Sequence, residues 1–154
     1  MAKAVFTGSF DPFTIGHAAL VRRALPMFER IIIGVGVNEN KKCMCDAQTR
    51  VSTIACLYAG ESRVEVKQYS DLTVDFAHRE GATFIIKGLR SVKDMEYERE
   101  QAIINMRIGH VETLLLFAEP EMEGISSSMV RELIHFGRNV DEFLPTPDDC
   151  KLSQ

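Results

Sequence analysis

Short apolar runs alternate with longer segments of helical character along the chain. The apolar runs are rich in valine, isoleucine and phenylalanine and carry few polar interruptions, which is typical of strands buried on both faces of a parallel sheet. The predicted strands are Ala4–Thr7, Ile31–Val37, Val64–Gln68, Thr83–Lys87 and Thr113–Ala118. The predicted helices are about His17–Phe28, Ala47–Ala59, Val74–Glu80, Asp94–Ile108 and Ser127–Phe136.

Residues that favour helix ends flank these helical segments. Asp46 and Ser126 precede two of them and have the side chains of N-caps. A glycine follows four of them, in the position where a left-handed backbone ends a helix; these are Gly60, Gly81, Gly109 and Gly137. The segment from Pro145 onward is polar and broken by proline, so we expect it to be loose.

Five strand–helix units in succession predict an α/β fold, a Rossmann-like, doubly wound sheet of five parallel strands with right-handed crossovers. The 154 residues suffice for a single domain over 1–154. Ligands of such sheets bind at the carboxyl ends of the strands. We therefore expect the site in the loops 8–16, 38–46, 69–73, 88–93 and 119–126.

Composition and charge exclude several other classes of protein. The net charge of −4 argues against a nonspecific nucleic-acid binder, which needs a broad cationic surface. No apolar run approaches the ~20 residues of a membrane span, and no export signal is evident, so we expect a cytoplasmic location. Cys43 and Cys45 form a C-x-C pair without a second pair, which argues against a zinc site.

The loop after the first predicted strand carries the clearest chemical signal. Gly8 allows the chain to turn sharply and a ligand to approach the backbone, and His17 falls in the first turn of the following helix, near free N–H groups that attract anions. A histidine alone at a helix start is more often a surface or capping residue. Joined to the run Gly8–Pro12, it favours a phosphate-binding site.

This loop resembles a known signature. Residues 8–12 (Gly-Ser-Phe-Asp-Pro) with 14–17 (Thr-Ile-Gly-His) are similar to the nucleotidyltransferase superfamily, whose T-x-G-H or H-x-G-H box contacts nucleotide phosphates. Residues 124–131 (Gly-Ile-Ser-Ser-Ser-Met-Val-Arg) resemble the I-S-S-[ST]-x-[IV]-R box of that superfamily. Alone, that second segment would be an ordinary serine-capped helix start.

Three further segments resemble the phosphopantetheine adenylyltransferase family. They are residues 87–92 with the acidic run that follows, Asn40–Lys42, and residues 69–72. Without the family resemblance, Lys41 and Lys42 would be interpreted as part of a solvated loop. Glu96 and Glu98 would be interpreted as the solvent-exposed face of a helix. Three positions depart from the usual pattern of the family: Thr7 and Cys43 each replace a proline, and Lys87 replaces an arginine, which leaves a point charge instead of a bidentate fork.

The resemblance implies reversible transfer of an adenylyl group from ATP to 4′-phosphopantetheine, giving dephospho-coenzyme A and pyrophosphate by direct in-line attack. It implies catalytic roles for His17, Lys41, Ser9 and Arg90. It implies nucleotide contacts for Ser9, Phe10, His17, Gly88, Leu89, Arg90, Glu98, Met122, Glu123, Gly124, Ile125, Ser126, Ser127 and Ser128. It implies phosphopantetheine contacts for Ser9, Lys41, Leu72, Thr73, Lys87 and Asn105. No protein metal ligand is expected, because Mg²⁺ would be held by substrate phosphates and water.

The family also implies a homo-oligomer, a hexamer, with coenzyme A as a feedback ligand. From the charge and the short apolar runs we expect no nucleic-acid or membrane partner. Three alternatives remain open from the residues. One is another transferase of the superfamily, such as a nicotinamide-mononucleotide adenylyltransferase or a glycerol-phosphate cytidylyltransferase. The others are a noncatalytic nucleotide sensor on the same fold and a nucleic-acid-binding module related to class I aminoacyl-tRNA synthetases.

Overall fold

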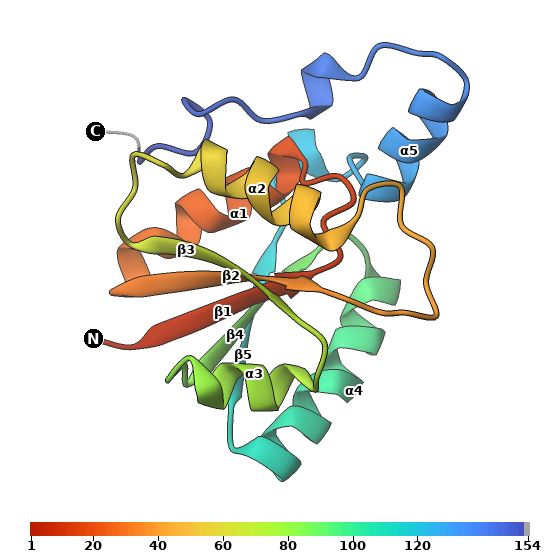
Figure 1. The fold of residues 1–154 in the computed structure, drawn as a ribbon. Coiled ribbons are helices and arrows are strands. Elements are labelled where there is room, and N and C mark those ends of the chain that lie inside the picture. Colours follow the sequence, from red (N-terminus) through yellow and green to blue (C-terminus); the bar gives the residue numbers. More distant parts are fainter. Residues whose placement is uncertain (153–154) are drawn as a thin grey trace.

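The fold is built on one sheet of parallel strands, shown in Figure 1. The computed structural model describes residues 1–152. The strands in this range are β1 (Lys3–Gly8), β2 (Arg30–Gly36), β3 (Val64–Tyr69), β4 (Phe84–Leu89) and β5 (Glu112–Phe117). Their order in the sheet is β3-β2-β1-β4-β5, and every neighbouring pair is parallel. The predicted doubly wound α/β sheet is confirmed.

A helix follows each strand, and the first four helices connect successive strands. The helices are α1 (Ile15–Ala24), α2 (Ala47–Leu57), α3 (Thr73–Arg79), α4 (Val92–Gly109) and α5 (Ser127–His135). The first ends earlier than predicted, because Pro26 follows it and the chain continues as a short 3-10 turn over Leu25–Met27. Within residues 1–152, no helix combines the length and the apolar character needed to cross a membrane.

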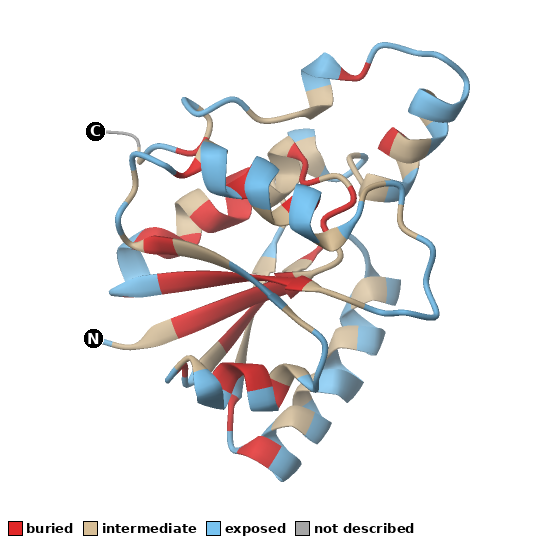
Figure 2. Cartoon of the chain, viewed as in Figure 1, coloured by how far each residue is buried: buried red, intermediate tan, exposed pale blue. Residues whose placement is uncertain are grey.

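The helices cover the sheet from both sides, with α1 and α2 on one face and α3 and α4 on the other (Figure 1). Successive residues of β1 point to opposite faces. Ala4 and Phe6 pack in the core beneath α1 and α2, whereas Val5 packs with Val74 and Phe76 of α3. The buried residues lie mainly along the strands and the inward sides of the helices, as Figure 2 shows.

The helix ends agree with the predictions only in part. Gly81 and Gly137 follow α3 and α5 with φ of +69° and +75°, as the left-handed position requires. At the end of α4 this conformation belongs to His110, at φ 51°, and not to Gly109. Gly109 is needed for packing instead, since an added Cβ would lie 2.7 Å from the Cβ of Val74.

Two other expectations about caps have different outcomes. Gly60 lies in open space and does not adopt the left-handed conformation, so that prediction is wrong. Both predicted N-caps are confirmed. Asp46 accepts a hydrogen bond from the N–H of Thr49 at 2.7 Å, and Ser126 accepts one from the N–H of Met129 at 3.1 Å.

The segment after Pro145, expected to be loose, lies against the domain up to residue 152. Arg22 of α1 donates to the carbonyl of Asp149 at 3.0 Å. The carboxylate of Asp149 accepts from the main-chain N–H of Thr146 at 2.7 Å, which closes a turn. Cys150 is buried in the core beneath α1 and α2. Leu152 also packs against this core, and the polar composition of the segment concealed both apolar contacts.

We predict that Gly34→Ala destabilises the fold, because the new Cβ would lie 2.5 Å from Cε1 of the fully buried Phe76. Overpacking of this kind typically costs about 1–3 kcal/mol, which lowers the melting temperature by roughly 2–4 °C per kcal/mol in a chain of this size. Thermal unfolding measures the effect. Gly60→Ala is the control, since nothing lies within 4 Å of its added Cβ. Equal melting temperatures for the two variants would contradict the packing of α3 on β2.

Candidate active site

Most of the predicted site residues lie together at the point in the sheet where the order of the strands changes direction. From β1 the chain builds β2 and β3 on one side of the sheet and then β4 and β5 on the other. The cleft at this switch point lies at the carboxyl ends of β1 and β4. Its lining includes Ser9, Phe10, His17, Lys41, Lys87, Gly88, Arg90, Glu98, Ser126, Ser127 and Ser128 from the predicted set.

His17 is oriented by the start of its own helix. Thr14 is the N-cap of α1, and its hydroxyl accepts from the N–H of His17 at 3.4 Å. In return, Nδ1 of His17 accepts from the main-chain N–H of Thr14 at 2.9 Å. The pair forms a capping box in which histidine takes the place usually held by glutamate or glutamine. Since Nδ1 is an acceptor, the neutral ring carries its proton on Nε2.

Aromatic rings fix the remaining freedom of the His17 ring. Phe13 stacks on it with centroids 5.2 Å apart, and Phe10 meets it edge-on at 5.0 Å. Burial, assisted by the positive charge of Arg90, lowers the pKa of His17 from 6.5 to about 4. The ring is therefore neutral near pH 7. It offers a fixed N–H donor to an anion without first losing a proton.

Lys41 reaches the first loop from the loop that follows β2. Its Nζ donates to Oγ of Ser9 at 3.0 Å. The ammonium group is solvent-exposed and carries no carboxylate partner in the part of the chain that the structure describes. The pair places an exposed cation beside a hydroxyl at the mouth of the cleft.

Lys87 lies deeper, on β4. Its Nζ donates to the carbonyl of Thr7 on β1 at 3.3 Å. Burial lowers the pKa of the Lys87 ammonium group from its ordinary value, and the negative charge of Glu98 offsets part of this effect. An anion entering the cleft would therefore meet a cation that lacks full hydration.

The start of α4 supplies Arg90. Ser91 caps this helix by accepting from the N–H of Asp94 at 3.2 Å. The carboxylate of Asp94 accepts from the main-chain N–H of Arg90 at 3.1 Å and lies 3.7 Å from its Nε. Arg90 is exposed at the cleft and held only loosely by this pair, so its guanidinium group is available to a ligand.

The start of α5 closes the cleft and is bound to the first loop. Ser127 donates from Oγ to the carbonyl of Pro12 at 2.7 Å. Arg131 donates to the carbonyl of Asp11 at 2.8 Å and to Oγ of Ser128 at 3.2 Å. Arg131 also lines the cleft, and the prediction missed it. The signal was present, since Arg131 is the final residue of the serine-rich box.

The other predicted residues lie elsewhere. Leu72 and Thr73 line a second hollow that adjoins the cleft and shares Ser9 and Lys41 with it. Three parts of the prediction do not line either hollow: Leu89, Asn105 and the stretch Met122–Ile125. Leu89 is buried and faces a separate hollow beside α4.

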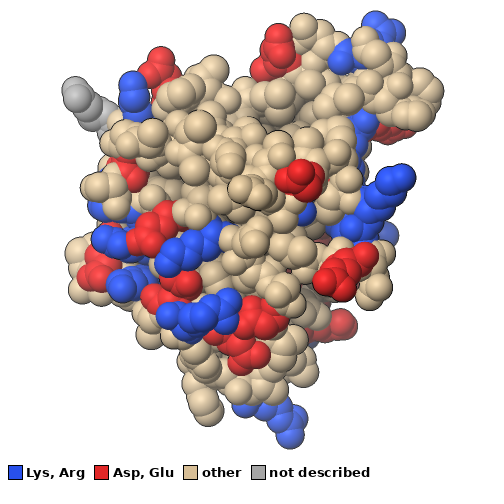
Figure 3. Space-filling model, viewed as in Figure 1, with Lys and Arg blue, Asp and Glu red and all other residues tan. Residues whose placement is uncertain are grey.

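The chemistry of the cleft suits a polyanion. It gathers the cations Lys41, Lys87, Arg90 and Arg131, serine hydroxyls and the N–H of His17, against a single carboxylate, Glu98. On the face shown in Figure 3, acidic and basic side chains are mixed and form no extended patch of one sign. Residues 1–152 contain no group of three or more histidine, cysteine or acidic side chains placed to hold a metal ion.

Relatives of the chain are nucleotidyltransferases. Residues 5–133 match the family model described as cytidylyltransferase-like. A phosphopantetheine adenylyltransferase from Phocaeicola vulgatus is 50% identical over 145 residues, covering 94% of this chain and 96% of that protein. One from Bacteroides thetaiotaomicron is 47% identical over 145 residues, covering 94% and 96%. One from Leuconostoc citreum is 43% identical over 146 residues, covering 94% and 92%.

A solved structure shares the fold. It is a bifunctional NMN adenylyltransferase/ADP ribose pyrophosphatase from Francisella tularensis, with a TM-score of 0.70 and 15% sequence identity. The match covers 99% of this chain and 46% of that one. The family match spans most of this chain, and relatives of nearly equal length share up to half of its residues. The chain therefore belongs to the cytidylyltransferase-like nucleotidyltransferases and, among these, to the phosphopantetheine adenylyltransferase family.

Proposed function

We propose that this chain transfers an adenylyl group from ATP to 4′-phosphopantetheine, reversibly, giving dephospho-coenzyme A and pyrophosphate in coenzyme A biosynthesis. One observation supports this above the rest. Four groups able to bind phosphate line one cleft, and they come from three segments: His17 from α1, Lys41 from the loop after β2, and Lys87 and Arg90 from the end of β4 and the turn that follows it. The relatives that match 94% of the chain are phosphopantetheine adenylyltransferases.

The phosphate of phosphopantetheine is already an anion, so its attack on the α-phosphorus of ATP needs no general base. The phosphorus–oxygen bond to pyrophosphate breaks as the new one forms, in line and without a covalent enzyme intermediate. The protein must hold two anions together and offset the charge that develops between them. His17 donates its Nε2–H to the reacting phosphate, Lys41 bridges nucleophile and α-phosphate, and Ser9 orients the same group.

In this arrangement the nucleotide and both reacting phosphates occupy the cleft, and the pantetheine arm extends into the adjoining hollow. Lys87 binds the phosphate of phosphopantetheine, and Leu72 and Thr73 contact its pantetheine arm. Arg90, Glu98 and the serines 126–128 bind the nucleotide. We propose that the nucleotide extends beyond the cleft to reach Leu89 and Met122–Ile125, and that phosphopantetheine extends beyond it to reach Asn105.

The site does not fit a resident metal ion. Its donors are hydroxyls, cations and one carboxylate, Glu98, whereas Mg²⁺ prefers several oxygen ligands and keeps most of its water. We propose that Mg²⁺ arrives on the phosphates of ATP and that this chain supplies it no ligand set of its own.

The family resemblance extends the proposal to assembly and regulation. We propose a homo-oligomer, a hexamer by resemblance, with coenzyme A as a feedback ligand and a cytoplasmic location. The outer face of α4 and β5 supports association, because Met95, Ile103 and Phe117 are large apolar side chains with 44%, 52% and 69% of their surface exposed.

Pyrophosphate release from ATP and Mg²⁺ tests the reaction, with and without 4′-phosphopantetheine. We expect release only with that acceptor. Release with nicotinamide mononucleotide instead, or with glycerol 3-phosphate and CTP, would assign another acceptor within the superfamily. ATP binding without release for any acceptor would support a nucleotide sensor.

We predict that His17→Ala lowers kcat by about 10²–10³-fold while ATP still binds, because one donor to the transition state is lost. Steady-state kinetics and equilibrium binding of ATP measure the two effects. His17→Gln is the control for the cap, since its amide oxygen can still accept from Thr14 and should preserve thermal stability. In the wild type, the pH profile of kcat should contain no ionisation of His17 near pH 6.5, because its pKa is lowered to about 4, so the profiles of wild type and His17→Gln should have the same shape in that range. An unchanged kcat in His17→Ala would refute its catalytic role.

We predict that kcat/KM of the wild type for phosphopantetheine falls as the pH rises. The midpoint of this decline should lie below the ordinary lysine pKa of about 10.4. The pKa of Lys87 is lowered, so its binding charge is present below that pKa and is lost as the pH rises through it. Lys87→Arg should remove the decline, because arginine stays charged. Lys87→Ala should show a raised KM for phosphopantetheine at every pH. A parallel decline in wild type and Lys87→Arg would place the titrating group elsewhere.

A further inference from the structure

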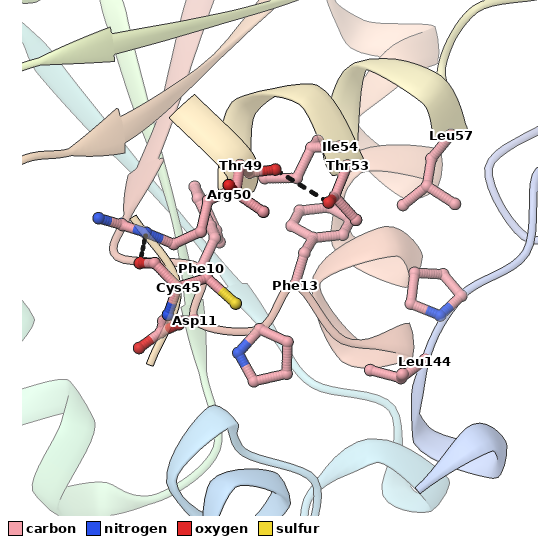
Figure 4. Close-up of a pocket in the computed structure, with 12 residues that line it drawn as sticks. Phe10, Asp11, Phe13, Cys45, Thr49, Arg50, Thr53, Ile54, Leu57 and Leu144 are labelled. Atoms are coloured by element: carbon pink, nitrogen blue, oxygen red, sulfur yellow. Dashed lines mark hydrogen bonds between the residues drawn. The ribbon is translucent and has the colours of Figure 1, made fainter. Parts of the chain in front are cut away.

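A third hollow lies between the first loop and α2. Phe10, Asp11, Phe13, Cys45 and Arg50 are among the side chains that line it, as Figure 4 shows. Arg50 comes from α2 and has only 6% of its surface exposed. The proposed reaction assigns it no part, although a buried arginine is uncommon and must be compensated.

The guanidinium group of Arg50 joins three segments of main chain. Nη1 donates to the carbonyl of Ser9 at 2.5 Å and to that of Gly36, at the end of β2, at 3.2 Å. Nε donates to the carbonyl of Cys45 at 3.0 Å. Within residues 1–152, no carboxylate lies within 4.0 Å of it. The hydrogen bonds of this buried cation therefore all go to main-chain carbonyl groups.

Asp11 makes a second link between the same loops. Its carboxylate is buried and accepts from the main-chain N–H of Met44 at 2.6 Å and that of Cys45 at 3.0 Å. The loop that carries Lys41 is thus held at its end by Asp11 and Arg50 together. The contact of 3.0 Å between Lys41 Nζ and Ser9 Oγ lies between two loops that these side chains connect.

The carbonyl of Ser9 belongs to the peptide group that precedes Phe10. Phe10 has a φ of 50°, in the left-handed region that a bulky side chain rarely adopts. Such a conformation persists only where its surroundings hold it. The bond from Arg50 fixes this peptide group, and the ring of Phe10 in turn packs edge-on against His17 at 5.0 Å.

We infer that Arg50 is a positioning residue for adenylyl transfer, which acts through Ser9, Lys41 and Phe10 without touching substrate. The inference rests on the proposed function. A lysine at this position would keep the charge but present a single donor point, whereas the planar fork of arginine reaches carbonyls in different directions. The geometry therefore requires arginine specifically, and not only a cation.

The first test compares Arg50→Lys with Arg22→Lys in the pyrophosphate-release assay. Arg22 also donates to a main-chain carbonyl, that of Asp149 at 3.0 Å, but serves the C-terminal segment. Arg50→Lys should lower kcat by about 10–100-fold, as expected for a displacement of reacting groups by about 1 Å. The Kd for ATP should change less than about threefold, since the loss is in alignment and not in binding. Arg22→Lys should retain the wild-type kcat, and equal kcat values in all three proteins would overturn the inference.

A double-mutant cycle distinguishes a positioning effect on Lys41 from a nonspecific disturbance of the structure. If Arg50 acts by placing Lys41, its replacement should matter less once Lys41 is absent. The fold-loss of kcat caused by Arg50→Lys should therefore be smaller in a Lys41→Ala background than in the wild type. An equal fold-loss in both backgrounds would overturn the part of the inference that runs through Lys41, because it would show an effect independent of that residue.

Hydrogen exchange supplies a readout that does not depend on activity. In Arg50→Lys, main-chain amides of residues 8–11 and 38–46 should exchange faster, with no change there in Arg22→Lys. Unchanged exchange in these loops would overturn the inference. If the wild type released no pyrophosphate with phosphopantetheine, the proposed function would fall, and exchange alone would still decide whether Arg50 holds the two loops. If Arg50→Lys did not fold, Asp11→Asn, which keeps only one acceptor oxygen for Met44 and Cys45, would take its place in each measurement.

Discussion

The cleft depends on how the carbonyl groups of one irregular loop are satisfied. Residues 9–13 leave the central strand, pass through a left-handed residue and lead into α1, so they lie outside the hydrogen bonding of both elements. Side chains from two helices take over. Arg50 of α2 binds the carbonyl of Ser9, Arg131 of α5 binds that of Asp11, and Ser127 of α5 binds that of Pro12.

The phosphate-binding groups are positioned from this loop and the strand before it. His17 is oriented by Thr14, at the end of the loop, and Lys41 contacts Ser9 near its beginning. Lys87 contacts Thr7, the residue before Gly8 in β1. Each contact fixes the direction of a donor without removing it from the cleft. A chain with a net charge of −4 thus concentrates positive charge at one edge of its sheet.

The fold and much of the cleft were predictable because they depend on local patterns. Buried strands appear as apolar runs, and parallel strands bring their following loops to one edge. Arg50 was not predictable, since a single arginine within a helix looks like a solvated residue and its partners are carbonyls up to 41 positions away. His110 in place of Gly109 at the end of α4, and the burial of Cys150, depend on packing between segments that are distant in sequence.

The pairing of β1 with β4 has a thermodynamic consequence. The cleft spans these two strands, and the contact between Lys87 and Thr7 joins residues 80 positions apart. The two sides of the cleft come from strands that are distant in sequence, so the cleft exists only in molecules in which β1 and β4 are paired. An anion that binds the cleft therefore binds only the folded chain. Ligand binding and folding are therefore linked. At a ligand concentration of 100 times Kd, mass action adds about 2.7 kcal/mol to the free energy of unfolding, and cellular substrate protects the enzyme that consumes it.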